Sequence, residues 1–369
     1  MTHRAVFKEL LVLLLIFLGL EGGYRLYKLH RYGLMDYPDV MAVGYFQVDP
    51  RYGCVAKKDF RSETMIPEKV RRDPALRRFY GARFTTNHWG YRSPEFAIPK
   101  PDGCFRILVL GDSASMNLEL NDEETWPARL QAQLQDDPHF RAMVHAQAIE
   151  VINGSNGAWR TREGLIRLRE EGVRLQPDLV LIAFGWTDVS QGVEGVDPEV
   201  VDMPRRRWWN YVKVFENLWV RWDVYQSEDK GQQDFLRRHL RRDTPWAHTF
   251  SRNLVGMQKV ASQVGAEAVL VNLPGLCRRE ALGTEEFQQV VEKTRVTAAN
   301  YSLWMEVEEF VAGLLWDVGR EAGMRVIDVS DHFRTFSDAR RLALFMDEMH
   351  VTQAGARETA TAVHQALAR

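Results

Sequence analysis

Short apolar runs, each followed by small or polar residues, constrain this chain more than any other feature. Arg106–Leu110 (RILVL) ends at Gly111, Glu150–Ile152 leads into a glycine-rich stretch, and Leu179–Phe184 ends at Gly185. Compact apolar runs are typical of buried parallel strands. Segments with helical spacing alternate with them. Strands that alternate with helices predict an α/β fold in which helices cover both faces of a parallel sheet.

The helical segments and the remaining strands follow in order along the chain. We expect helices at Trp126–Leu134, at Leu165–Leu175, near Leu303–Ala322 and after Thr352. Thr352 is well placed to cap the last of these helices. A helix and a strand together occupy Val255–Leu273, and Arg325–Val329 is the final strand.

The N-terminus carries an uninterrupted apolar run at Leu10–Leu20. Eleven residues are short for a membrane span, but flanking residues extend the run. It also fits the apolar core of a signal peptide, although no small-x-small cleavage site follows it. We interpret residues 1–24 as an uncleaved signal anchor. Basic residues lie on both sides of the run, so the positive-inside rule does not fix its orientation. We expect the main domain to lie outside the cytoplasm, in the periplasm.

The rest of the chain divides into two parts. Residues 25–100 are rich in Tyr, Arg, Pro and Gly and predict a spacer followed by a cap of short strands and turns. Residues 101–369 form the predicted α/β domain. A helical insertion interrupts it at about 190–252 and contains Arg205–Trp209 (RRRWW) and further tryptophans. The insertion is interpreted either as a lid over the core or as a segment in contact with a membrane.

Composition excludes several classes of protein. A formal net charge of −2 provides no overall attraction to nucleic acid. The cysteines Cys54, Cys104 and Cys277 are too few for a disulfide scaffold and lack metal-ligand spacing. They are either three separate thiols or one disulfide and one thiol. No histidines form an H-x-x-x-H pair, so we expect neither a metal nor another cofactor.

Polar residues follow the predicted strands at the edge where ligands bind in open parallel sheets. Gly111-Asp112-Ser113 follows the first strand, Asn153–Gly157 (NGSNG) the second and Gly185–Asp188 (GWTD) the third. Asp347–His350 (DEMH) comes after the last strand. A serine hydroxyl needs a neighbouring histidine to take its proton, and that histidine needs a carboxylate to orient it. We therefore expect Ser113 as nucleophile, His350 as base and Asp347 as the orienting acid.

The motifs GDSAS, NGSNG, GWTD and DEMH resemble, in order, the four motif blocks of the SGNH/GDSL hydrolases. The upstream segment 85–96 (TTNHWGYRSPEF) looks like the segment that precedes the GDS strand in membrane-anchored bacterial members of this family. The resemblance covers roughly residues 105–369. It implies a three-layer, flavodoxin-like fold and a serine esterase or deacylase. The implied substrate is a carboxylic ester, such as an O-acyl or O-acetyl ester, of an envelope glycan or lipid.

The chain departs from the family in its oxyanion donors. The third block usually reads G-x-N-D, but Thr187 replaces the asparagine whose amide donates to the oxyanion. The expected donors are the N–H groups of Ser113 and Gly157 and the hydroxyl of Thr187, with Gly154 as the alternative glycine. His332, beside Asp331, is a rival base. An O-acyltransferase that acts on polysaccharide is a second hypothesis. Thr187 motivates a third, a non-catalytic glycan-binding or assembly protein with the same fold.

Overall fold

A computed structural model describes residues 3–32, 44–49, 51–74, 77–192, 240–293 and 298–369. Its main sheet has five parallel strands: β3 (Cys104–Gly111), β4 (Ala148–Asn153), β5 (Leu179–Ala183), β6 (Glu267–Asn272) and β7 (Arg325–Asp328). Their order in space is β4-β3-β5-β6-β7. Numbered from the first strand of the sheet this is 2-1-3-4-5, the order of the flavodoxin-like doubly wound fold. The predicted fold class is confirmed.

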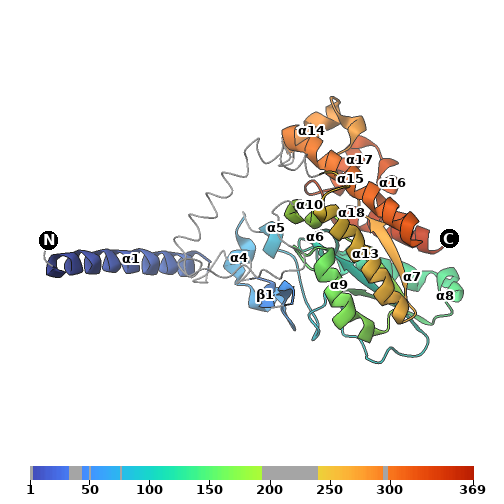
Figure 1. Cartoon of the computed structure of the whole chain (residues 1–369), viewed down its shortest axis with the longest axis horizontal. Helices are drawn as coiled ribbons and strands as arrows, with labels where there is room; N and C mark the ends of the chain where they lie inside the picture. The colour runs from blue at the N-terminus through green and yellow to red at the C-terminus, as the bar shows by residue number, and fades with distance from the viewer. Residues whose placement is uncertain (1–2, 33–43, 50, 75–76, 193–239, 294–297) are drawn as a thin grey trace.

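Helices cover both faces of this sheet (Figure 1). One layer contains α9 (Thr161–Glu170), α13 (Pro245–Gln263) and α15 (Ala298–Ala322), and the other contains α7 (Trp126–Asp136), α16 (Val329–Arg334) and α18 (Gln353–Leu367). The shorter helices of this part are α6 (Ser113–Met116), α8 (Pro138–Met143), α10 (Trp186–Gly192), α14 (Glu285–Lys293) and α17 (Asp338–Leu344). Among the described residues, 3₁₀ turns lie at Asp122–Glu124, Gly172–Leu175 and Arg279–Ala281.

Most predicted elements agree with the structure, and one differs. The hydroxyl oxygen of Thr352 accepts from the N–H of Gly355 at 3.3 Å and caps α18 as expected. The single helix expected at Leu165–Leu175 is wrong, because α9 ends at Glu170 and a 3₁₀ turn follows at Gly172–Leu175. A Cβ at Gly172 would lie 2.9 Å from side-chain atoms of both Leu108 and Leu168. Close packing on β3 therefore accompanies the change in helix type.

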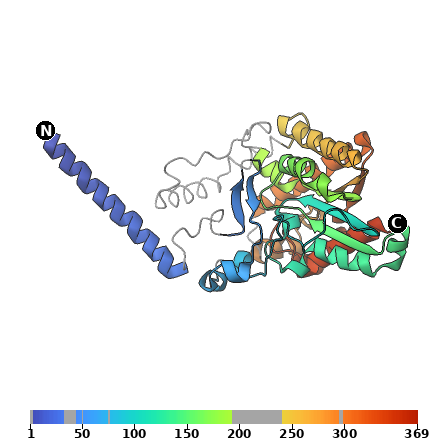
Figure 2. The ribbon, with the colours of Figure 1, turned by 90° about the horizontal axis from the view of Figure 1, so that it is seen from below.

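The N-terminal helix α1 (His3–Tyr32) extends away from the rest of the molecule (Figure 1, Figure 2). Its segment Phe7–Tyr27 has a mean hydropathy of 1.7, and none of it is buried in the structure. A helix of this length and composition can span a membrane. At its C-terminal end, the carbonyl of His30 accepts from Lys69 Nζ at 3.2 Å, so this helix touches the segment that follows it.

Residues between α1 and β3 form a small aromatic core of their own. They include the antiparallel pair β1 (Phe46–Asp49) and β2 (Gly53–Ala56) and the short helices α3 (Ser62–Met65), α4 (Glu68–Arg72) and α5 (Arg77–Tyr80). We call residues 44–92 the cap segment. Tyr45, Phe60, Tyr80 and Phe84 are buried in it together with Met116 of α6. The cap segment therefore packs against the helix that begins at Ser113.

The insertion expected at about 190–252 lies largely outside the described residues, and so do Arg205–Trp209. Trp246, at its C-terminal end, is buried in α13 and packs against Phe250 and Phe310. All three cysteines are free thiols, so the alternative of a disulfide is wrong.

A buried arginine fastens the cap segment to the loop after α6. The guanidinium of Arg92 donates to the carbonyls of Met116 at 2.7 Å, Asn117 at 2.5 Å and Leu120 at 2.5 Å, and pairs with Asp122 at 3.0 Å. Burial holds the pKa of Arg92 below its usual range, although Asp122 opposes this effect. Bonds to a buried charge stabilise a fold only while every partner is present.

We predict that Arg92→Lys destabilises the protein by about 2–4 kcal/mol, because one ammonium cannot satisfy three carbonyls and a carboxylate. Urea unfolding followed by circular dichroism measures the change. Arg83→Lys is the control, since Arg83 is an exposed neighbour that pairs with Glu123. Equal midpoints for the two variants would contradict the account.

Candidate active site

The carboxyl ends of three neighbouring strands bring the motif residues to one place. Val109 of β3 pairs with Asn153 of β4, and Gly111 of β3 pairs with Ala183 of β5. The order of the strands changes direction between β3 and β5, and ligands bind at such a switch point. A Cβ at Gly111 would lie 2.7 Å from the carbonyl oxygen of Ala183. Only glycine therefore fits at the end of β3.

Asp112 positions Ser113 by capping α6. Its Oδ1 accepts from the N–H of Ala114 at 3.0 Å, and its Oδ2 accepts from the N–H and the hydroxyl of Thr187, both at 3.3 Å. Asp112 is fully buried, and burial raises its pKa against these hydrogen bonds. Its carboxyl therefore braces the turn after β3 against the loop after β5, as an N-cap does.

Ser113 and Asp347 each lie within hydrogen-bond reach of the His350 ring, at opposite nitrogens. Nε2 of His350 is 3.0 Å from Oγ of Ser113. Nδ1 of His350 is 2.9 Å from Oδ2 and 3.1 Å from Oδ1 of Asp347. A carboxylate beside Nδ1 favours the tautomer whose proton sits there, which leaves Nε2 to accept from the serine hydroxyl.

The acid of this trio is held by several donors. Oδ1 of Asp347 accepts from the N–H of Met349 at 3.0 Å and of His350 at 2.7 Å. Oδ2 accepts from the guanidinium of Arg78 on α5. Burial raises the pKa of Asp347, but the hydrogen bond and the charge of His350 outweigh burial and hold it below its usual range. Asp347 is therefore ionised at neutral pH.

The charges around His350 favour its protonated form. Burial lowers the pKa of His350, but the hydrogen bond to Asp347 and the charges of Glu119 and Asp112 raise it to about 9. A histidine with a pKa in this range is mostly protonated at neutral pH. Nε2 can therefore accept the proton of the Ser113 hydroxyl only in the deprotonated fraction of molecules, and this fraction grows as the pH rises towards 9.

The proposed oxyanion donors have mixed surroundings. The N–H of Ser113, at the start of α6, has no hydrogen bond to another described residue. The N–H of Gly157 points at the sulfur of Met116 at 3.1 Å, and the hydroxyl of Thr187 donates to Asp112. The N–H of Gly154 donates to the carbonyl of Val109 at 2.8 Å, in the sheet. Gly154 is therefore the weaker choice of glycine.

Two residues weighed from the sequence lie elsewhere. His332 pairs with Glu358 of α18 through Nε2 at 3.1 Å, whereas His350 reaches Ser113. Asp188 accepts from the N–H of Thr161 at 3.0 Å and from its hydroxyl at 2.7 Å, at the start of α9. Burial raises the pKa of Asp188 to about 7 against these bonds. Asp188 therefore joins the third motif (GWTD) to α9, the helix that follows the second motif (NGSNG).

The sequence did not point to Arg78 or Glu119. Arg78 belongs to a basic stretch without a motif, and Glu119 lies six residues after Ser113 in a loop. Together with Pro74, Arg77, Gly81, Ala82, Asn121 and Met346 they line an open cleft of about 530 Å³ beside Asp347. Four of its eight lining residues carry polar or charged side chains.

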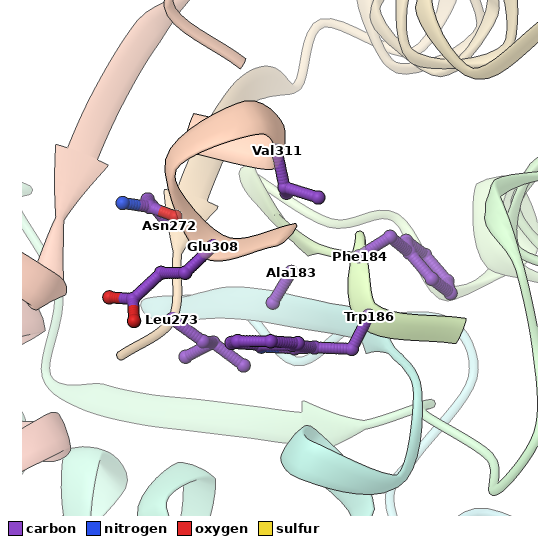
Figure 3. A pocket seen from close by; sticks show the side chains of 7 residues that line it. All are labelled: Ala183, Phe184, Trp186, Asn272, Leu273, Glu308 and Val311. Carbon is purple, nitrogen blue, oxygen red and sulfur yellow. The ribbon is translucent and has the colours of Figure 1, made fainter. Parts of the chain in front are cut away.

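A second, enclosed cavity lies under the third motif. Its walls are Ala183, Phe184, Trp186, Asn272, Leu273, Glu308 and Val311, and Figure 3 shows Glu308 and Val311 reaching it from α15. Its volume is about 10 Å³, room for one water molecule. It is too small for an acyl group.

Comparisons with known proteins agree with the resemblance seen in the motifs. A stretch of 96 residues is 38% identical to a curated arylesterase of Vibrio mimicus and covers 26% of this chain and 42% of that protein. The chain thus spans less than half the length of this relative. No family model matches.

Solved structures of ester hydrolases are similar to this one. A lipase/acylhydrolase from Enterococcus faecalis is 16% identical, with a TM-score of 0.40 over 72% of this chain and 95% of its own. A mutant acetylxylan esterase from Geobacillus stearothermophilus is 13% identical, with a TM-score of 0.43 over 71% and 94%.

We predict that the imidazole of His350 titrates well above 6.5, towards pH 9, because its neighbours are carboxylates. NMR of ¹³C-labelled histidine measures it, and His350→Gln identifies the signal. In Asp347→Asn the titration moves down, since burial persists while the nearest negative charge is lost. A wild-type value at or below 6.5 would contradict the prediction.

Proposed function

We propose that this chain is a serine ester hydrolase of the SGNH type. The observation that carries the proposal is the contact of 3.0 Å between Nε2 of His350 and Oγ of Ser113, with Asp347 on the other side of the ring. Such an arrangement activates a serine hydroxyl as a nucleophile. The curated arylesterase relative supports the same activity.

The reaction proceeds through an acyl-enzyme. Oγ of Ser113 attacks the ester carbonyl carbon while Nε2 of His350 takes the hydroxyl proton, and the imidazolium is stabilised by Asp347. The proton then passes to the leaving alkoxide as the C–O bond breaks. Water, deprotonated by His350, attacks the acyl-enzyme and releases the carboxylic acid and Ser113. No cofactor takes part in these steps.

Three donors serve the oxyanion in this proposal. The N–H of Ser113 is oriented by the first turn of α6. The N–H of Gly157 becomes a donor when an oxyanion replaces the weak acceptor Met116, and the hydroxyl of Thr187 does so by rotating away from Asp112. Oxyanion donors act by being fixed before charge develops. Because two of these three must exchange partners, we expect a slower chemical step than a donor amide would give.

The proposed substrate is an O-acyl or O-acetyl ester of an envelope glycan or lipid. Polar and charged residues of the open cleft, among them Arg77, Glu119 and Asn121, suit a hydroxyl-rich leaving group better than an acyl chain. The helix α1 would hold the catalytic domain, residues 101–369 with the cap segment against it, beside a membrane. We place that domain outside the cytoplasm.

We predict that Ser113→Ala lowers kcat/KM for p-nitrophenyl acetate by about 10⁴-fold or more, because no other group can form the acyl-enzyme. Release of p-nitrophenol measures the rate. Ser115→Ala is the matched control: it lies on the same helix and is buried, but has no described contact with His350. If Ser113→Ala and Ser115→Ala have equal kcat/KM values for p-nitrophenyl acetate, the proposal is wrong.

Thr187 provides a second test. If its hydroxyl donates to the oxyanion, Thr187→Val keeps the shape and lowers kcat by about 10²-fold, whereas Thr187→Asn supplies an amide and restores or raises kcat. Steady-state kinetics on the same ester measures both. An unchanged kcat in Thr187→Val assigns the oxyanion to the backbone N–H groups alone.

Transfer to a polysaccharide hydroxyl would use the same acyl-enzyme, with the acceptor in place of water. Incubation with an acyl donor and a glycan, followed by mass spectrometry of the glycan, distinguishes transfer from hydrolysis. A non-catalytic glycan-binding role, motivated by Thr187, predicts glycan binding without Ser113-dependent turnover.

A further inference from the structure

The cap segment sends one charged side chain into the catalytic trio. Arg78 lies on the four-residue helix α5, and its Nη2 contacts Oδ2 of Asp347. Oδ2 is also the oxygen 2.9 Å from Nδ1 of His350. Asp347 thus bonds the base and Arg78 through one oxygen, and the hydrogen-bonded chain from Ser113 through His350 ends on the cap segment.

Arg78 also faces a second carboxylate. Its Nη2 is 3.8 Å from Oε1 of Glu119, whose side chain is only 5% exposed. Among the described ion pairs of Glu119, Arg78 is the only cation. A buried carboxylate is costly unless a cation lies near it. One guanidinium therefore lies beside both Asp347 and Glu119.

The position of Arg78 depends on the packing of the cap segment. Tyr80, two residues later, is 2% exposed and packs against Tyr45 at 5.6 Å between ring centroids. The N–H of Gly81 donates to the carbonyl of Arg77 at 2.8 Å and closes the turn of α5. Buried aromatic packing on one side of α5 thus fixes the direction in which Arg78 extends.

We propose that Arg78 is a positioning residue of the active site: it holds Asp347 in place and offsets the negative charge that surrounds His350. The proposal rests on the proposed hydrolase function, which makes His350 the base. It makes the cap segment part of the catalytic apparatus, because the carboxylate that orients the base is itself oriented from the cap.

The charged groups that face His350 come from several elements. They are Asp347 and Glu348 beside it, Asp112 at the start of α6, Glu119 in the loop after α6 and Arg78 of α5. Four are acidic and one is basic. Loss of the single cation leaves the imidazolium with attractive neighbours only, so the base should hold its proton more tightly.

The test compares Arg78→Met with Arg77→Met in the full-length protein. Arg78→Met keeps the length of the apolar stem but removes the charge. We expect the titration of His350, and the acid limb of kcat/KM against pH, to move up by about half to one pH unit, since one charge is lost several ångströms away. The plateau value of kcat should fall about 10-fold, because Asp347 loses the hydrogen bond from Arg78 that holds it in place. Arg77→Met changes the adjacent exposed position and should not move the titration of His350, which is read without substrate.

Two further variants check the cause. Arg78→Lys retains the charge and should return the titration of His350 to the wild-type value, with a partial recovery of kcat. In Asp347→Asn, Arg78→Met should have little further effect on kcat, because Arg78 acts through that carboxylate. Arg78→Gln replaces Arg78→Met if the latter does not fold, since it keeps a donor without the charge.

The His350 titration is read by NMR without turnover, so failure of this proposal is distinct from failure of the hydrolase assignment. A titration that stays within 0.2 pH units of wild type in folded Arg78→Met or Arg78→Gln, or that moves equally in Arg77→Met, overturns the role of Arg78. Ser113-independent hydrolysis overturns the assignment and leaves the charge coupling standing.

Discussion

The parallel pairing of β3 with β4 on one side and β5 on the other determines where every part of the site lies. Because the register aligns Gly111 with Ala183 and Val109 with Asn153, the loops after three strands begin at the same edge. Hydrogen bonds then join these loops to one another. Asn153 Nδ2 donates to the carbonyl of Ser115 at 3.1 Å, and the N–H of Asn156 donates to that of Gly111 at 3.1 Å. The loops at this edge are therefore joined to one another by hydrogen bonds.

Carboxyl groups, each with a different set of partners, set the chemistry on that edge. Asp112 is buried with neutral donors and serves the turn, so burial raises its pKa. Asp347 has a histidine, two N–H groups and Arg78 as partners, and remains ionised. The same residue type can therefore brace a loop in one place and, in the mechanism that we propose, orient a base in another. Through its contact with Asp347, Arg78 connects one of these carboxylates to the cap segment.

The sequence predicted the parallel sheet, its strand ends and the last helix because all three depend on local patterns: apolar runs, the glycine at the end of β3 and the cap at Thr352. It also predicted that Ser113, His350 and Asp347 would meet, on the spacing of Asp347 and His350 and the resemblance of four motifs. It did not predict Arg78 or Glu119, because contacts across 269 residues leave no periodic signal. The sequence also did not predict that α9 ends at Glu170, and the reason is related. Gly172, in the 3₁₀ turn that follows, packs closely against Leu108, which lies far away in the sequence.

The central claim is that Ser113 is a nucleophile activated by His350, and covalent labelling tests it most directly. A fluorophosphonate reacts with an activated serine and leaves the phosphonyl group on it, which peptide mass spectrometry locates. The account predicts labelling on Ser113 in the wild-type protein and its loss in His350→Ala. Absence of label from Ser113 in the folded wild-type protein, or labelling that persists without His350, would contradict it.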